Sequence, residues 1–322
     1  MPSGADERVF VEAGARLHFG VLDLRGARGR WFGGIGAAAP APALLVSARP
    51  ATRLEVIGED AGRAEEFAAR FLAHHGVRGG AHVQVHRALP GHAGLGSGTQ
   101  LALSVARALA ELHRLPADVR ALARAVGRAR RSAVGSWTFA GGGLVVEGGR
   151  RPDRDECGPL IARVAFPPAW RCVVAIPAAA EPGMSGAAED AALASLPAPP
   201  DHEVERVSHL TLMALLPAVA DADLPAFGRA LTEIQRLTGS WFASVQGGAF
   251  ARGASVELVR RMSEWGACGV GQSSWGPAVY GVVEGDEAGA RLAERVQDAM
   301  GGAGAVFVGP FRSEGAKVWR GR

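Results

Sequence analysis

The feature that most constrains this chain is a glycine-rich segment, residues 90–100, that lies between a strand-like and a helix-like pattern. Upstream of it, Val83 and Val85 alternate with polar neighbours, as in a half-buried strand. Downstream, apolar residues recur at helical spacing, and Ser97 or Thr99 is predicted to cap the helix. Glycines let backbone N–H groups approach an anion, and a helix N-terminus adds partial positive charge. We call residues 90–100 the anion loop, and it predicts a binding site for a phosphorylated small molecule.

The glycine spacing of the anion loop distinguishes it from two better-known phosphate loops. A Walker loop ends in Lys-Ser or Lys-Thr, whereas the only lysine of the chain is Lys317. Gly94, Gly96 and Gly98 do not have the spacing of the dinucleotide-binding fingerprint. The loop instead resembles the Pro-x-x-x-Gly-Leu-Gly-Ser-Ser loop of the GHMP kinase superfamily. Its departure from that pattern is a Gly-Thr pair at positions 98 and 99.

Composition predicts a cytoplasmic enzyme without membrane or nucleic-acid partners. With 322 residues, 48% hydrophobic and 21% charged, the chain is long enough for two closely packed domains. No segment approaches the ~20 apolar residues that span a bilayer, and no secretory signal is expected. Cys157, Cys172 and Cys268 lack metal-ligand spacing and are expected to be reduced thiols. The net charge of +3 comes from dispersed arginines, so nucleic-acid binding is not predicted.

Two further segments carry residues with the chemistry of an active site. Residues 7–24 begin as a strand and bring Arg16, His18 and Asp23 together in a short stretch, which favours catalysis over packing. A cluster of arginines is either a solvated helix face or a bidentate phosphate site; its members are Arg124, Arg128, Arg130 and Arg131.

Three glycine- or proline-rich segments have less specific interpretations. Residues 29–36 are predicted to form a flexible binding loop or an ordinary hairpin connection. Residues 177–200, which follow a strand at 172–176, are predicted to form a mobile loop or lid. Residues 269–281 combine hydroxyls with Trp275 and Tyr280, which suit a flat ring or the protein core equally well.

The order of these segments resembles one family within the superfamily, β-ribofuranosylaminobenzene 5′-phosphate synthase. The resemblance covers nearly the whole chain, and its most specific segment is Gly-Gln-Ser-Ser-Trp-Gly-Pro at 271–277. The matching segments are 16–19, 32–36, 131–135, 183–186, 233–235, 246–248 and 271–277. The resemblance implies an α+β GHMP kinase fold and a homodimer. Residues 1–165 would form an N-terminal domain with the anion loop, and residues 166–322 a C-terminal domain with an aromatic-substrate loop at 269–281.

The resemblance also implies a reaction. The family joins phosphoribosyl pyrophosphate (PRPP) to 4-aminobenzoate, or to 4-hydroxybenzoate in some archaeal members, in tetrahydromethanopterin biosynthesis. The products are a C-riboside, carbon dioxide and pyrophosphate. This chemistry requires a divalent metal, expected to be Mg²⁺, and no ATP. The residues leave the choice between the amino and the hydroxy benzoate open.

Site roles follow from the resemblance as expectations. The pyrophosphate would bind the anion loop, at Gly94, Leu95, Gly96, Ser97, Gly98 and Thr99. Arg16 would bind phosphate or the benzoate carboxylate, His18 would act as an acid or orienting group, and Asp23 would bind the metal or stabilise the cation. Arg130 and Arg131 would bind the 5′-phosphate. The aromatic substrate would contact Gln272, Ser273, Ser274 and Trp275.

Two other functions remain open from the sequence. An ATP-dependent kinase for a sugar, mevalonate or homoserine is compatible with the anion loop. Many such kinases have an Asp-Asn pair where this chain has Ser136 and Trp137, but homoserine kinases also lack that Asp. The second is a binding protein with an inactive site, which the presence of Arg16, His18 and Asp23 disfavours.

Overall fold

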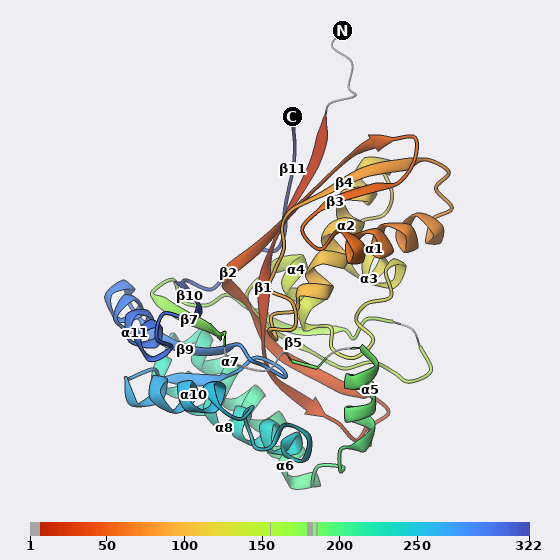
Figure 1. The fold of residues 1–322 in the computed structure, drawn as a ribbon. Helices are drawn as coiled ribbons and strands as arrows, with labels where there is room; N and C mark the ends of the chain where they lie inside the picture. The colour runs from red at the N-terminus through yellow and green to blue at the C-terminus, as the bar shows by residue number, and fades with distance from the viewer. Residues whose placement is uncertain (1–6, 155, 179–182, 185) are drawn as a thin grey trace.

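Two long antiparallel strands form the centre of the molecule, whose computed structural model describes residues 7–154, 156–178, 183–184 and 186–322 (Figure 1). β1 (Arg8–Asp23) and β2 (Phe32–Ala51) pair along most of their length, and alternate β1 residues from Val9 to Leu17 are buried. This two-residue period is that of a strand with one face in the core. The long pair therefore supplies a rigid support for every segment that packs on it.

Further strands complete the first sheet. β4 (Gly80–Arg87) pairs with β2, and β3 (Glu55–Gly58) runs parallel to β4. β5 (Leu144–Glu147) pairs with β2 and with β6 (Leu160–Val164). β11 (Lys317–Gly321), near the end of the chain, pairs with β1. The strand order is β11-β1-β2-β4-β3, with β5 and β6 off this path.

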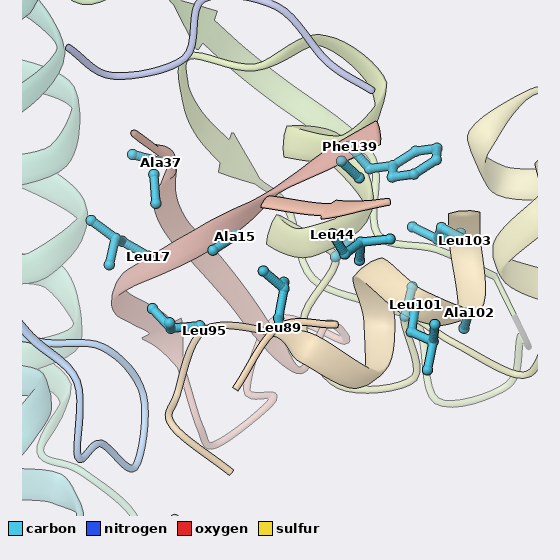
Figure 2. Close-up of a cluster of buried hydrophobic side chains, with 14 of the residues drawn as sticks. Ala15, Leu17, Ala37, Leu44, Leu89, Leu95, Leu101, Ala102, Leu103 and Phe139 are labelled. Atoms are coloured by element: carbon cyan, nitrogen blue, oxygen red, sulfur yellow. The ribbon is translucent and has the colours of Figure 1, made fainter. Parts of the chain in front are cut away.

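Four helices gather beside the first sheet (Figure 1). They are α1 (Ala61–His74), α2 (Ser97–His113), α3 (Val119–Ala125) and α4 (Val134–Gly141). α2 is the central one, and its small residues Ala102 and Ala106 are fully buried against its neighbours. Figure 2 shows Leu89 and Leu101 beside strand residues such as Leu44 in this core. Burial of this apolar face holds the N-terminus of α2 in a fixed place relative to β1.

A second sheet has the order β10-β7-β9-β8. Its strands are β7 (Trp170–Pro177), β8 (Gly269–Gln272), β9 (Val279–Glu284) and β10 (Gly304–Gly309). A separate apolar cluster packs α10 (Ala254–Glu264) and α11 (Asp286–Ala299) on it, through Met262 and Val296. The remaining helices are α5 (Gly186–Ser195), α6 (Asp201–Leu210), the π-helical turn η1 (Thr211–Leu215), α7 (Leu216–Ala220), α8 (Leu224–Trp241) and α9 (Ala243–Gln246).

Helix α8 joins the two sheets. The side chain of Gln235 donates a hydrogen bond to the carbonyl of Phe19 in β1 and accepts one from the N–H of Gln272 in β8, at 2.9 Å. A Cβ on Gly20 would lie 2.9 Å from Ile234 of the same helix, so a glycine is needed for this close approach. The part of β1 that contains Phe19 and Gly20 is thereby held against the end of β8.

The structure confirms several predicted elements and corrects others. The strand at Val83 and Val85 and the helix after the anion loop are present, and the mainly antiparallel sheets with helices match the expected α+β class. The N-cap prediction was wrong, because Gly96 precedes the helix in a left-handed conformation and no side chain caps it. The flexible loop predicted at 29–36 was also wrong in part, because β2 begins at Phe32.

The glycines of β2 explain the second error. A Cβ on Gly36 would lie 2.3 Å from the carbonyl oxygen of Leu17, and one on Gly34 would lie 2.7 Å from Val134. These glycines allow close packing between elements rather than loop flexibility. Within the predicted loop or lid at 177–200, residues 186–195 form helix α5, whereas residues 179–182 and 185 lie outside the described residues.

The division into domains at residue 165 stays a prediction. β6 ends at Val164 and the second sheet begins at Trp170, but β11 returns to the first sheet after the second is complete. In the described part of the chain, no helix is both long and apolar enough to span a bilayer.

Candidate functional site

A cavity of about 520 Å³ opens where the anion loop, β1, α5 and the end of α8 converge. Its walls come from segments far apart in the sequence, because both sheets contribute. The residues used below that line it are Arg16, His18, Arg63, Gly94, Gly96, Ser97, Gly98, Thr99, Arg128, Arg130, Arg131, Ser132, Glu189, Phe242, Gln272, Ser274 and Trp275. Most of the residues predicted from the sequence therefore meet in one place.

The anion loop depends on two glycines with positive φ. Gly94 and Gly96 both have φ of 76°, a conformation that strains other residues. A Cβ on Gly94 would lie 2.1 Å from the carbonyl oxygen of Ser273, so the loop also packs directly on the 273–278 segment. Gly96 immediately precedes α2, and the first N–H groups of a helix have no partners within it. Since Ser97 and Gly98 line the cavity, an anion bound there meets the positive end of α2.

Leu95 does not share this position. Its side chain is only 1% exposed and lies in the hydrophobic core, as Figure 2 shows. Its backbone carbonyl accepts a hydrogen bond from the N–H of Arg16 at 3.0 Å. The side chain of Leu95 therefore anchors the loop, and binding of pyrophosphate by the backbone at this position stays a prediction.

Arginines surround the N-terminus of α2. A Cβ on Gly98 would lie 3.2 Å from a guanidinium nitrogen of Arg128 and 3.5 Å from one of Arg63. The guanidinium of Arg128 also lies 4.7 Å from the ring centroid of Phe67. Burial, together with repulsion from Arg63, Arg70 and Arg131, lowers the pKa of Arg128. An anion in this cluster would relieve the repulsion, so the arrangement favours a multiply charged anionic ligand.

Only part of the arginine cluster predicted from the sequence lines the cavity. Arg130 and Arg131 line the cavity, whereas Arg124 is exposed and is not part of the lining. Arg131 lies 2.8 Å from the carboxylate of Glu189 and 3.1 Å from that of Asp190. Arg63 was missed, because on an amphipathic helix such as α1 an arginine is usually a solvated residue.

Arg16 and His18 lie side by side on β1 at the floor of the cavity. The Arg16 guanidinium donates a hydrogen bond to the carbonyl of Gly94, and burial lowers its pKa to about 10, with Glu189 opposing the shift. Burial and the nearby Arg16 lower the pKa of His18 to about 3. The imidazole is therefore neutral at physiological pH, which favours the predicted orienting role over that of a proton donor.

Asp23 is not brought to this cavity. Its carboxylate accepts a hydrogen bond from the N–H of Arg25 at 2.7 Å, and Asp23 is not among the residues that line the cavity. The predicted role of Asp23 as metal ligand or cation stabiliser thus has no support from the geometry. Its neighbours Val21 and Leu24 line the cavity, whereas the Asp23 carboxylate, at the last position of β1, is engaged by Arg25 instead.

Glu189 of α5 is the acidic side chain that the sequence reasoning missed. Besides pairing with Arg131, it accepts a hydrogen bond from the indole nitrogen of Trp275 at 3.0 Å. Among the described residues it is the one acidic side chain in the cavity lining. Its place within the 177–200 segment was the available signal, since that segment was predicted to form a mobile loop or lid.

The 269–281 segment divides its residues between cavity and core. Gln272, Ser274 and Trp275 line the cavity, and the Trp275 ring meets that of Phe242 edge-on, with centroids 5.0 Å apart. Ser273 is fully buried and does not line the cavity, so its predicted contact with the aromatic substrate is not supported. Its hydroxyl instead accepts from the N–H of His18 at 2.9 Å and donates to the carbonyl of Gly94 at 2.7 Å. Tyr280 belongs to the core, where its ring packs on Phe19.

Metal ligands are scarce in the described part of the chain, which has no group of three or more His, Cys, Asp or Glu side chains suited to a metal ion. Mg²⁺ commonly binds through one or two carboxylates together with substrate phosphates and water. Glu189 fits that arrangement, because it lies in the cavity lining with arginines that attract phosphates. The cavity is therefore compatible with Mg²⁺ that arrives with a phosphorylated substrate.

The buried neutral state of His18 makes a prediction about acid stability. Because its folded pKa of about 3 lies below the ordinary value of 6.5, the unfolded chain takes up a proton first as the pH falls. The contribution of His18 to the unfolding free energy is fully present above about pH 6.5 and is lost progressively as the pH falls toward 3. From pH 7 to pH 5 the parent should lose about 2 kcal/mol of unfolding free energy that His18→Gln does not lose.

Urea unfolding at the two pH values measures this difference. His202→Gln is the matched control, because His202 is an exposed residue of α6. That variant should lose as much stability as the parent. An equal loss in the parent and in His18→Gln would show that the histidine is not held neutral in the folded state.

Comparisons with known proteins identify the superfamily and the relatives of this chain. Residues 63–142 match the family model of the GHMP kinases N terminal domain, and residues 215–302 match that of the GHMP kinases C terminal. The chain is 34% identical to β-ribofuranosylphenol 5′-phosphate synthase of Methanothermobacter thermautotrophicus, over 96% of this chain and 98% of the relative. It is 36% identical to the protein of that name from Archaeoglobus fulgidus, over 85% and 88%.

Solved structures share the fold at low sequence identity. A homoserine kinase from Cytophaga hutchinsonii has a TM-score of 0.70 at 16% identity, with 99% of each chain covered. A mevalonate pyrophosphate decarboxylase from Streptococcus pyogenes has a TM-score of 0.67 at 15% identity, with 95% of this chain and 97% of that chain covered. The expected GHMP kinase fold is thereby confirmed.

Proposed function

This chain belongs to the β-ribofuranosylphenol 5′-phosphate synthase family, and from that membership we propose that it joins PRPP to 4-aminobenzoate or 4-hydroxybenzoate. It is an enzyme of the pentosyltransferase type. The proposed products are a C-riboside 5′-phosphate, carbon dioxide and pyrophosphate. The proposed place of the reaction is an early step of tetrahydromethanopterin biosynthesis.

One observation carries the proposal most directly: a single cavity combines an anion site with an aromatic wall. The anion site consists of the N-terminus of α2 with Arg63 and Arg128 beside Gly98. The aromatic wall consists of Phe242 and Trp275, whose rings are in edge-on contact. PRPP requires the first feature for its pyrophosphate, and a benzoate ring requires the second.

The reaction needs orientation and charge stabilisation more than proton transfer. Departure of pyrophosphate from C1 of the ribose leaves an oxocarbenium-like centre. The ring carbon that bears the carboxylate attacks this centre, because the para amino or hydroxyl group makes it nucleophilic. The bond to the carboxylate then breaks, carbon dioxide leaves and the ring regains aromaticity. No base has to remove a proton from that carbon, so a site rich in fixed cations is suited to the chemistry.

The residues of the cavity have separate roles in this proposal. The N-terminus of α2 with Arg63 and Arg128 would hold the departing pyrophosphate, and Arg130 and Arg131 would bind the 5′-phosphate. Arg16, whose guanidinium donates to the carbonyl of Gly94, would bind phosphate or the benzoate carboxylate. His18 would orient a substrate as a neutral imidazole. The guanidinium of Arg16 is held by the carbonyl of Gly94 before the substrate arrives, which lowers the cost of reorganisation.

Mg²⁺ belongs to the proposal as a partner of the pyrophosphate. Glu189 would supply one protein ligand, and the bound ion would neutralise charge that develops on the leaving oxygens. Arg131, which now pairs with Glu189, would then be released toward the 5′-phosphate. A homodimer likewise stays a prediction.

A labelled-substrate assay tests the proposed function. Purified protein with Mg²⁺, PRPP and carboxyl-labelled 4-aminobenzoate or 4-hydroxybenzoate is expected to release labelled carbon dioxide. Release should require PRPP, should stop when EDTA removes the metal, and should not require ATP. The better of the two benzoates identifies the acceptor. Absence of release with both, together with hydrolysis of ATP stimulated by a small alcohol, would contradict the proposal and indicate a kinase.

A further inference from the structure

A buried carboxylate lies behind the cavity, connected to His18 through one hydroxyl group. Glu147, the last residue of β5, is fully buried and does not line the cavity. Its carboxylate accepts hydrogen bonds from the N–H groups of Ala133, at 3.2 Å, and Gly149, at 2.8 Å. The Ser132 hydroxyl is its third partner. A buried carboxylate with three donors has a specific structural task, because its desolvation is costly.

The packing around Glu147 leaves room only for glycine. A Cβ on Gly34 would lie 2.9 Å from both a carboxylate oxygen of Glu147 and the Ser132 hydroxyl oxygen. A Cβ on Gly158 would lie 2.4 Å from the other carboxylate oxygen. Burial raises the pKa of Glu147 to about 7, while its three hydrogen bonds oppose the shift. Above neutral pH the ionised carboxylate is an acceptor only.

The single proton of the Ser132 hydroxyl determines which group donates in the hydrogen bond between Ser132 and His18. Its oxygen lies 3.2 Å from Nε2 of His18 and accepts from the N–H of Val134, also at 3.2 Å. When the hydroxyl donates its one proton to the Glu147 carboxylate, it has only lone pairs to offer His18. Nε2 must then carry the ring proton and donate it to Ser132. Nδ1 is left as the nitrogen with a lone pair.

We propose that Glu147 and Ser132 are positioning residues that hold His18 as the neutral Nε2–H tautomer, so that Nδ1 serves as a hydrogen-bond acceptor for a substrate. An imidazole that lines the cavity and is fixed in this form accepts a hydrogen bond at Nδ1 and does not donate one there. The groups it can accept from are the ribose hydroxyls and the para hydroxyl or amino group of the benzoate. The choice of substrate group rests on the proposed function, whereas the tautomer of His18 does not.

Nitrogen-15 NMR of the full chain at pH 8 tests the tautomer without any substrate. Histidine-labelled parent protein should show a ring proton on Nε2 of His18, assigned by its absence in His18→Gln. In Ser132→Ala this proton loses its acceptor and should exchange with water more than about tenfold faster. Ser132→Thr, which keeps a hydroxyl, should retain the slow exchange. Ser136→Ala is the matched control, because Ser136 is a fully buried serine of α4 whose hydroxyl faces Cys157.

Kinetics of the same variants test the positioning role. Ser132→Ala should lower kcat by about 10–100-fold while KM for both substrates changes little, because the loss of a residue that orients another side chain has effects of this size. Ser132→Thr, which keeps the hydroxyl, should recover most of the lost kcat. A parent spectrum with the proton on Nδ1, or unchanged slow exchange in Ser132→Ala, would overturn the proposal even if a variant were unstable. Unchanged kcat in Ser132→Ala would overturn the positioning role. Failure of the parent to use PRPP would refute only the proposed function, since the NMR result does not depend on turnover.

Discussion

Gly94→Ala is expected to cost about 2–4 kcal/mol of unfolding free energy and most of the activity. Two effects add. Gly94 has φ of 76°, where a side chain costs about 1–2 kcal/mol. The new Cβ would also lie 2.1 Å from the carbonyl oxygen of Ser273, and a backbone atom cannot move as a flexible side chain can. The anion loop would be pushed off the 273–278 segment, and KM for PRPP should rise more than about tenfold because the N–H groups no longer converge.

Gly91→Ala is the matched control for this prediction. Gly91 lies in the same loop, but a Cβ there would have no heavy atom within 4 Å. Its stability and KM should stay close to those of the parent. Thermal unfolding and initial rates at varied PRPP measure both quantities. If Gly94→Ala behaved like Gly91→Ala, the contact between the anion loop and the 273–278 segment would not be required for binding.

Arg16→Met should lower kcat/KM by about 10²–10³, because it removes a buried cation from the cavity but keeps the aliphatic stem. The guanidinium donates to the carbonyl of Gly94, and its stem packs on the loop, where a Cβ of Gly96 would lie 2.9 Å from Cγ of Arg16. Loss of a charge that contacts a bound anion costs about 2–5 kcal/mol in a desolvated site. Because the stem remains, the fold should be kept.

Arg107→Met separates the loss of a cavity cation from the general loss of an arginine. Arg107 lies on α2 and pairs with Glu111 one turn away, at 2.9 Å. Such partly exposed pairs contribute little, so activity and stability should change only slightly. Steady-state kinetics with each substrate varied in turn measure the effect. A kcat/KM for Arg16→Met within about threefold of the parent would place Arg16 outside the reaction, whereas the role proposed for it requires a loss many times larger.

The parts of the site that could be predicted are those whose signal is local. A strand, a glycine loop and a helix N-terminus follow one another within residues 80–113, so the anion loop was recognisable from spacing alone. Arg16 and His18 share one strand with a two-residue spacing, which places both side chains on the same face. Asp23 did not follow this pattern, because a register shift after His18 interrupts the alternation and Arg25 engages its carboxylate.

Other site residues or their roles could not be predicted, because contacts between distant segments determine them. Arg63 and Glu189 come from α1 and α5, and neither helix has a motif that marks these side chains as part of a site. Ser273 lies within the most specific motif of the family, yet its hydroxyl joins His18 to Gly94 rather than contacting the cavity. The sequence does not specify where a side chain points in a short connection between strands, because its orientation is determined by packing against other elements.

The sequence by itself determined the family, the α+β class and the anion loop, because each rests on residues close together in the chain or on motifs in a fixed order. Only the tertiary structure decided which charges share the cavity. It brings Arg63, Arg128 and Glu189 to the cavity and leaves Asp23 outside its lining. It also decided that His18 is neutral and connected through Ser132 to Glu147. The physical reason is that pKa and hydrogen-bond direction depend on burial and on neighbours across the fold, which composition and spacing do not specify.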